Sequence, residues 1–302
     1  TSVVESGGTD TYTIRLATQP SGDVVVTIAD DGQVIASAGL LVFTSANWSS
    51  AQTVTVWAEP DAVDEDLIHA GKLTHAASGG GYGGVAIADV DVAVIDDDAA
   101  GFAVGPISGP VSEAGATATF TLALASQPTA SVTIDLASSD PGEGLVVPAQ
   151  VVFTPADWNV ARTITITGVD DQIDDGDQAF SVLLDTTASG DPAYPVTTDP
   201  APVAVTCSDN DAIGVIIAAS DGSTAVSEAG PTSDTYTVRL ASEPTGTVTV
   251  TIDPDAQLQA SPASLSFTAG DWNVPQQVTV SAAADNVAEG AHTGLVRHLV
   301  AG

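Results

Sequence analysis

Apolar and polar residues alternate with a period of two along most of the chain. The segments 117–124, 163–167 and 247–252 place threonine at one set of alternate positions and mainly aliphatic or aromatic residues at the other. This spacing is typical of half-buried β-strands, whereas a helix requires apolar residues every three to four positions. No segment shows a sustained helical period with a capping residue. The pattern therefore predicts an all-β protein.

The strand pattern recurs as three similar blocks. Each block opens on a Glu followed by small residues, and each carries a Phe-Thr pair with a Trp five residues after the Phe. The opening residues are Glu5, Glu113 and Glu228, and the tryptophans are Trp48, Trp158 and Trp272. The glutamates are 108 and 115 residues apart, and the tryptophans are 110 and 114 residues apart. This period is that of a whole domain and is longer than a solenoid repeat.

Each block predicts one sandwich domain. The middle block has seven predicted strands, at about 102–107, 117–125, 131–137, 149–154, 161–168, 178–186 and 202–208. About one hundred residues in seven short strands is typical of an immunoglobulin-like β-sandwich. We therefore expect three tandem sandwiches, which we call repeat 1 (1–98), repeat 2 (99–211) and repeat 3 (212–302).

The two outer repeats are predicted to be incomplete. Repeat 1 lacks the strand that precedes the opening Glu in the other two, and repeat 3 ends in or just after its sixth strand. We expect a segment of a longer array of such repeats. In the alternative interpretation, a neighbouring chain supplies the missing strand by β-augmentation.

The charge and the cysteine content of the chain disfavour several classes of partner and exclude an intrachain disulfide. The formal net charge is −34, with 39 acidic residues and five Lys plus Arg, so phosphate-rich partners and anionic membranes are disfavoured. Cys207 is the only cysteine, so an intrachain disulfide is excluded. No run of about twenty apolar residues occurs, which disfavours a helical membrane span.

Acidic residues concentrate in three elements of each repeat. In repeat 2 these are the opening Glu113, the loop 170–177 between strands five and six, and the stretch 209–211 after strand seven. Alternate strand connections lie at the same end of a sandwich, so we expect these acids to converge. Five carboxylates within eight residues repel one another, and Ca²⁺, which takes six to eight oxygen ligands, would remove that repulsion.

These elements resemble the Calx-β domain, which occurs in sodium/calcium exchangers and in arrays of bacterial surface proteins. The matching stretches are 111–115, 170–175 and 94–102. The resemblance implies Ca²⁺ at the end of each sandwich. For repeat 2 it implies the ligands Glu113, Asp170, Asp171, Asp175, Asp209 and Asp211, with a backbone carbonyl at Ile173.

The other two repeats supply corresponding acids. Repeat 1 offers Glu5, Asp61, Asp64, Glu65, Asp96, Asp97 and Asp98, and repeat 3 offers Glu228, Asp285 and Glu289. The sequence departs from the family pattern at Pro60, at Gln178 and at Asn210, where acids are common. Repeat 3 has no terminal aspartates in this chain, so we expect its site to be weak or empty.

Several features have simpler interpretations. The acidic loops could be solvated surface or an adaptation to high salt, although such acids should then spread over the strand faces, which carry Thr, Ser and Gln instead. Core packing is the expected role of the three tryptophans, with sugar stacking as the alternative, and Cys207 is expected to be a buried apolar residue. The histidines form two pairs six residues apart without a cysteine, which disfavours a metal site. They are His69 and His75, and His292 and His298.

No nucleophile with a base and no nucleotide fingerprint is present, so we expect a non-catalytic protein. The sequence favours a calcium-binding structural module that forms a rigid stalk in a large secreted or cell-surface bacterial protein. Its partners would be neighbouring repeats or like subunits, and a surface glycan or protein. The alternatives are a carbohydrate- or protein-binding module, and a subunit of a surface layer or extracellular filament.

Overall fold

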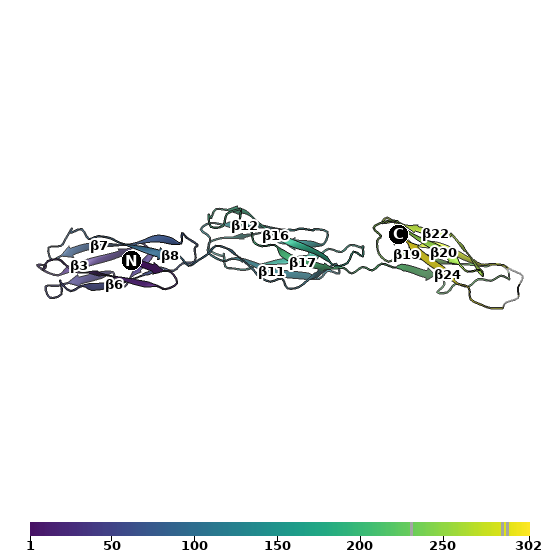
Figure 1. The fold of residues 1–302 in the computed structure, drawn as a ribbon, viewed down its shortest axis with the longest axis horizontal. Helices are drawn as coiled ribbons and strands as arrows, with labels where there is room; N and C mark the ends of the chain where they lie inside the picture. Colours follow the sequence, from purple (N-terminus) through teal and green to yellow (C-terminus); the bar gives the residue numbers. More distant parts are fainter. Residues whose placement is uncertain (230–231, 285–286, 288–289) are drawn as a thin grey trace.

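The chain folds into three β-sandwiches that follow one another along the long axis of the molecule (Figure 1). The structure, a computed structural model, describes residues 1–229, 232–284, 287 and 290–302. Each sandwich encloses its own apolar cluster, and the all-β sandwich prediction is confirmed. In the described part of the chain, no helix has the length and apolar character needed to span a bilayer.

Repeat 2 contains the largest set of strands. These are β9 (Phe102–Val104), β10 (Val111–Ser112), β11 (Thr117–Leu124), β12 (Val132–Ser138), β13 (Gly144–Val147), β14 (Gln150–Phe153), β15 (Arg162–Gly168), β16 (Gln178–Ser189) and β17 (Val203–Ser208). One sheet has the order β10-β17-β16-β12-β14, and the facing sheet has the order β13-β15-β11-β9. The apolar positions of the alternating pattern, such as Phe120, Ile134 and Ile164, point into the core between the sheets.

Two short strands of repeat 2 go beyond the seven that the sequence predicts. β10 has two residues and pairs in parallel with β17, which is remote in sequence. β13 pairs with β15 in one sheet, whereas β14 pairs with β12 in the other. Only Pro148 and Ala149 separate β13 from β14, so the chain crosses from one sheet to the other within two residues. The pattern of apolar and polar residues does not mark this crossing.

Repeats 1 and 3 share this arrangement. Repeat 1 contains β1 (Ser2–Val4), β2 (Thr9–Ile14), β3 (Val24–Asp30), β4 (Val34–Ala36), β5 (Leu40–Phe43), β6 (Gln52–Ala58), β7 (Ile68–Gly79) and β8 (Val90–Ile95). Its sheets have the orders β1-β8-β7-β3-β5 and β2-β6-β4. Repeat 3 contains β18 (Val215–Ala219), β19 (Ser233–Leu240), β20 (Val248–Pro254), β21 (Leu258–Ser261), β22 (Ser264–Phe267), β23 (Gln276–Ala282) and β24 (Val296–Ala301), in the orders β18-β19-β23-β21 and β22-β20-β24.

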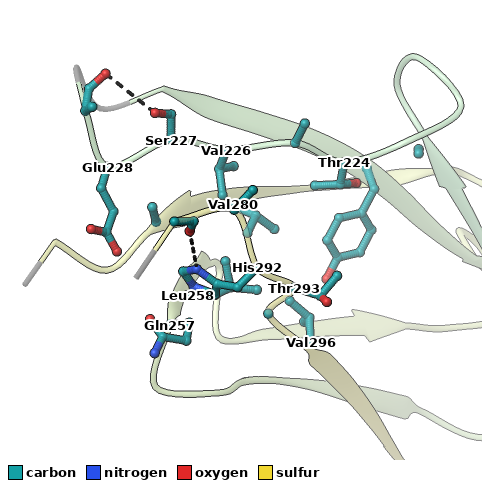
Figure 2. Close-up of a pocket in the computed structure, with 18 of the residues that line it drawn as sticks. Thr224, Val226, Ser227, Glu228, Gln257, Leu258, Val280, His292, Thr293 and Val296 are labelled. Carbon is teal, nitrogen blue, oxygen red and sulfur yellow. Dashed lines mark hydrogen bonds between the residues drawn. The ribbon is translucent and has the colours of Figure 1, made fainter. Parts of the chain in front are cut away.

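Repeat 3 is open along one side. Strand β24 corresponds to β7 and β16, but within its described residues repeat 3 has no counterpart of β8 or β17 beside it. A cavity of about 770 Å³ lies between the two sheets at this side, lined by residues that include Leu258, Val280 and Val296 (Figure 2). The apolar interior that β8 and β17 cover in the other repeats is therefore accessible here.

The tryptophans that recur once in each repeat pack against the cores. Trp48 and Trp158 are partly buried against the apolar clusters of repeats 1 and 2, and Trp272 is buried in that of repeat 3. The backbone carbonyl of each accepts a hydrogen bond from a leucine amide at 2.9 to 3.0 Å, and the donors are Leu16, Leu124 and Leu240. Cys207 is also buried, in the core of repeat 2. These positions agree with the core interpretation rather than with a sugar-stacking surface.

One core contact is filled differently in neighbouring repeats. In repeat 2, Gly144 of β13 faces the ring of Phe180, and a Cβ on this glycine would overlap the ring. At the same two positions repeat 1 has Val34 facing Gly71. Each repeat thus joins one glycine to one large residue, with the order reversed between repeats 1 and 2.

The substitution Gly144→Val is therefore expected to destabilise repeat 2 by about 1–3 kcal/mol, the usual cost of overpacking a core. Combining it with Phe180→Gly recreates the arrangement of repeat 1 and should recover part of the loss. Urea unfolding of the two single variants and the double variant would measure the coupling. Strictly additive changes in the free energy of unfolding would show that the two substitutions do not compensate for each other's change in side-chain volume.

Candidate metal centres

Acids from distant parts of the chain meet at one end of repeat 2. Glu113 follows β10, and Asp209 and Asp211 follow β17. One carboxylate oxygen from each of these three side chains lies within 4.8 Å of the others. The parallel pairing of β10 with β17 creates this proximity, and the Glu113 amide extends it by donating to the Ser208 carbonyl at 3.2 Å. We call this group, with the adjoining acidic loop 170–177, the acidic pole of repeat 2.

Hydrogen bonds fix the acidic loop against the end of β17. The Asp209 carboxylate accepts from the amides of Asp211 and Gly176, both at 2.7 Å. The Asn210 amide donates to Glu113 Oε2 at 3.1 Å, and its side chain donates to Asp170 Oδ1 at the same distance. The loop therefore holds its carboxylates near Glu113.

The acidic pole of repeat 1 is formed by Glu5, loop 61–66 and Asp96 to Asp98, and it shares part of this hydrogen-bond pattern. Asp96 accepts from the amides of Asp98 at 3.0 Å and Glu65 at 2.9 Å, as Asp209 does in repeat 2. The Glu5 amide donates to the Ile95 carbonyl at 3.1 Å. One carboxylate oxygen each from Glu5, Asp96 and Asp98 lies within 4.8 Å of the others.

Some buried carboxylate oxygens at each of these two poles have no hydrogen-bond partner. Neither oxygen of Glu5 has a hydrogen-bond donor, and the same holds for Oδ2 of Asp211. Glu5 and Glu113 are only 6% and 5% exposed. The basic side chains Lys72 and Arg162 form ion pairs with other acids, namely Asp89, Asp91 and Asp157.

Burial and mutual repulsion disfavour the ionised forms of these acids. Burial, followed by the charges of Asp61 and Asp96, raises the pKa of Glu5 from 4.5 to about 7. Burial is also the main cause that raises the pKa of Glu113, of Asp98 and of Asp211, and neighbouring carboxylates add to each shift. A bound divalent cation would reverse this cost, because it supplies both charge and partners for the oxygens. The donors are hard oxygens in an irregular arrangement, which fits Ca²⁺.

The structure brings some of the predicted ligands together and places others only nearby. It groups Glu5 with Glu65, Asp96 and Asp98, and Glu113 with Asp209 and Asp211. Asp61, Asp64, Asp170 and Asp171 lie near enough to raise the pKa of a grouped acid, and Asp97 is exposed beside them. The Ile173 carbonyl accepts a hydrogen bond from the Asp175 amide at 3.0 Å. Glu228 lines the cavity of repeat 3, and Asp285 and Glu289 lie outside the described residues.

Glu143 was not singled out from the sequence, and His69 was named there only as one of the histidines for which a metal site was disfavoured. Burial, followed by the charges of Asp175 and Asp140, raises the pKa of Glu143, which places this residue at the acidic pole of repeat 2. His69 lies beside Glu5 and Glu65 at the acidic pole of repeat 1. Glu143 precedes β13, and only the register of the strands reveals that this connection reaches the same end of the sandwich.

Comparison with known proteins gives only distant likenesses. No protein-family model matches the chain, and no curated protein sequence matches it. Among solved structures, CBD12 from CALX1.2 is 15% identical over 64% of this chain and 81% of that chain, with a TM-score of 0.27. Domains 4–9 of the surface layer protein SbsC are 11% identical over 89% of this chain and 37% of that chain, with a TM-score of 0.29. A marsupial T cell receptor is 11% identical over 98% of this chain and 96% of that chain, with a TM-score of 0.28. At these identities and TM-scores, the likenesses carry no argument about function.

The raised pKa of Glu5 predicts opposite pH effects without and with calcium. In the metal-free protein the folded state binds this proton more tightly than the unfolded chain, so the stability of repeat 1 should fall as the pH rises from about 5 to about 8. One pKa unit corresponds to about 1.4 kcal/mol, so a loss on the order of 2–3 kcal/mol is expected. Calcium affinity should instead fall as the pH drops below about 7, because protons compete for the carboxylate.

Thermal unfolding of metal-free protein across this pH range and calorimetric calcium titrations would measure both effects. The variant Glu5→Gln provides the control, since a neutral amide of similar shape should remove most of the pH dependence of repeat 1. An unchanged dependence in this variant would contradict the assignment to Glu5.

Proposed function

We propose that the chain is a non-catalytic structural module in which Ca²⁺ at the acidic poles stiffens a rod of Calx-β-like sandwiches. The observation that carries this proposal is that the acidic loop also holds the following repeat. Asp64 Oδ2 accepts a hydrogen bond from the Ala100 amide at 2.9 Å, and Asp174 Oδ2 accepts one from the Ile213 amide at 2.6 Å. A cation that orders this loop would therefore also order the start of the next repeat.

A second hydrogen bond recurs at both junctions. The Ala62 carbonyl accepts from the Gln127 amide, and the Gln172 carbonyl accepts from the Glu243 amide, each at 2.6 Å. The two junctions thus use the same positions of the acidic loop, on either side of repeat 2. Repetition of one geometry favours a straight, regular stalk over a flexible string of domains.

The setting proposed for such a stalk is the cell surface or the extracellular space. Extracellular modules bind Ca²⁺ with dissociation constants of roughly 10⁻⁴ to 10⁻³ M, close to the calcium concentration outside cells. The strongly negative surface, at −34 for the chain, also suits a protein that must remain soluble and extended. The proposed partners are neighbouring repeats of the same kind, with a distal glycan or protein ligand beyond the stalk.

Small-angle X-ray scattering of the full chain tests the stiffness directly. With millimolar Ca²⁺ we expect a larger radius of gyration than with chelator, because the junctions no longer bend. The double variant Asp64→Ala with Asp174→Ala should remain bent in Ca²⁺, since it removes the carboxylates that hold the linker amides. The exposed Asp185→Ala in β16 is the matched control. Equal dimensions with Ca²⁺ and with chelator would overturn the proposal.

A further inference from the structure

A histidine enters the acidic pole of repeat 1. His69 stands at the start of β7, and its side chain is 14% exposed. One donor atom each from His69, Glu5 and Glu65 lies within 4.8 Å of the others. The shortest separations are 3.1 Å from His69 Nδ1 to Glu65 Oε2 and 3.8 Å from His69 Nε2 to Glu5 Oε1.

The hydrogen bonding of His69 leaves one ring nitrogen available. Its Nε2 is 3.1 Å from Gln33 Oε1, and because an amide oxygen only accepts, Nε2 carries the proton. In the neutral ring Nδ1 therefore has a lone pair, and this atom has no hydrogen-bond partner. A carboxylate, amide or carbonyl that holds the outer nitrogen is the usual support for a histidine that binds a metal through the other.

Glu5 supplies the second, independent indication of a ligand. Its side chain is 2% exposed, and both of its oxygens lack a donor. Glu5 also belongs to the group with Asp96 and Asp98 that the proposed Ca²⁺ site uses. A carboxylate that is shared by two donor groups, and has two free oxygens, can bridge two cations.

The two donor groups differ in chemical character. Glu5 with Asp96 and Asp98 offers only carboxylate oxygens, which suit Ca²⁺. His69 with Glu5 and Glu65 adds an imidazole, which is preferred by zinc and other first-row transition metals. One or more imidazoles with carboxylates, three protein ligands in all, leave a fourth tetrahedral position for water at a zinc ion.

We propose that repeat 1 holds a second cation of a different class, a divalent transition metal such as Zn²⁺, bound by His69 Nδ1, Glu65 and one oxygen of Glu5. This inference goes beyond the calcium-stiffened rod and shares only Glu5 with it. Binding at this position would tie β7 to the acidic loop and to the end of β1 independently of Asp96 and Asp98.

Repeat 2 provides an internal comparison without an imidazole. Gln178, at the start of β16, takes the position of His69, and its side chain donates to the Asp175 carbonyl at 2.9 Å. Glu143 takes the position of Gln33, since the carbonyls of both accept from the residue that follows the neighbouring strand. Repeat 2 therefore has neither the histidine nor the glutamine whose side chain supports it, and it lacks an imidazole nitrogen that could bind a metal.

The experiment is a titration of the metal-free full chain with Co²⁺, monitored by visible absorption, and with Zn²⁺, monitored by calorimetry, both in millimolar Ca²⁺. We expect repeat 1 to provide a site with the intense absorption of four-coordinate Co²⁺, which Zn²⁺ displaces. His69→Gln, which installs the residue of repeat 2, should weaken Zn²⁺ at least tenfold and abolish the absorption. Gln33→Leu should weaken it about 10- to 100-fold, as expected for loss of outer support.

The matched control is His75→Gln on the same strand. His75 bonds to Tyr12 and to the Ala88 carbonyl rather than to the acidic pole, so this variant should bind Zn²⁺ as the parent does. Undiminished Zn²⁺ binding by His69→Gln, or no Zn²⁺ site at all, would overturn the proposal. Displacement of Co²⁺ by excess Ca²⁺ would overturn it as well. The calcium-dependent stabilisation of repeat 2 does not involve His69. Measuring that stabilisation therefore tests the proposed calcium-stiffened rod independently of the zinc site.

Discussion

Calcium at about 10 mM is expected to raise the unfolding temperatures of repeats 1 and 2 by about 10–20 °C relative to chelator. A site with a dissociation constant of about 10⁻⁴ M is stabilised by about 2.7 kcal/mol at 100-fold excess of ligand. Each kcal/mol shifts the midpoint of a domain of this size by roughly 4–8 °C. Differential scanning calorimetry would resolve the shift, which should be small or absent in repeat 3.

A salt control separates site binding from general screening. If the acidic loops were only a solvated surface, NaCl at the same ionic strength would stabilise the repeats as much as CaCl₂ does, because screening of exposed charges depends on ionic strength. We expect most of the stabilisation to require Ca²⁺. Equal shifts in the two salts would refute specific binding at the acidic poles.

Asp209→Ala is expected to lower the calcium affinity of repeat 2 by about 100-fold or more, on the order of 3 kcal/mol. The substitution removes a carboxylate from the group with Glu113 and Asp211. It also removes the acceptor for the amides of Gly176 and Asp211, so the loop loses its attachment to the end of β17. Isothermal titration calorimetry would count the sites and measure the affinity that remains.

The corresponding control leaves the acidic pole intact. Asp185→Ala removes the same charge from an exposed position on β16, so its affinity and site count should match those of the parent. Asp96→Ala should reproduce the loss in repeat 1 and leave repeat 2 unchanged. A similar loss in Asp185→Ala would indicate that net charge, rather than the local geometry, governs binding.

The fold could be predicted because its strands carry a local signal. Alternation in 117–124 and 163–167 indicates which face of each strand is buried, and β11 and β15 follow these segments closely. The approach of Glu113 to Asp209 could also be inferred, because connections of alternate strands share one end of a sandwich. These inferences need only the order of the strands and the period of the pattern.

Other features depend on contacts that leave no local signal. β10 is a strand only because β17, more than ninety residues later, lies beside it. The role of His69 depends on Gln33, which approaches from the connection before β4 and has no motif of its own. The spacing of His69 and His75 suggested no metal site, because the acids near His69 come from other segments.

In the cores, a glycine faces a larger residue at two equivalent positions, and the order of the two is reversed between repeats 1 and 2. This difference bears on how similar neighbouring domains avoid swapping strands during folding. If β4 docked onto repeat 2, Val34 would meet the ring of Phe180, whereas β13 in repeat 1 would set Gly144 against Gly71 and leave a hole. Repeat 3 has Leu258 against Gly294 and so matches repeat 1 rather than its immediate neighbour. Tandem domains misassemble most readily with adjacent copies, which emerge together and remain tethered. Because the larger residue changes position from one repeat to the next, a strand that docks onto the adjacent repeat by mistake packs poorly there.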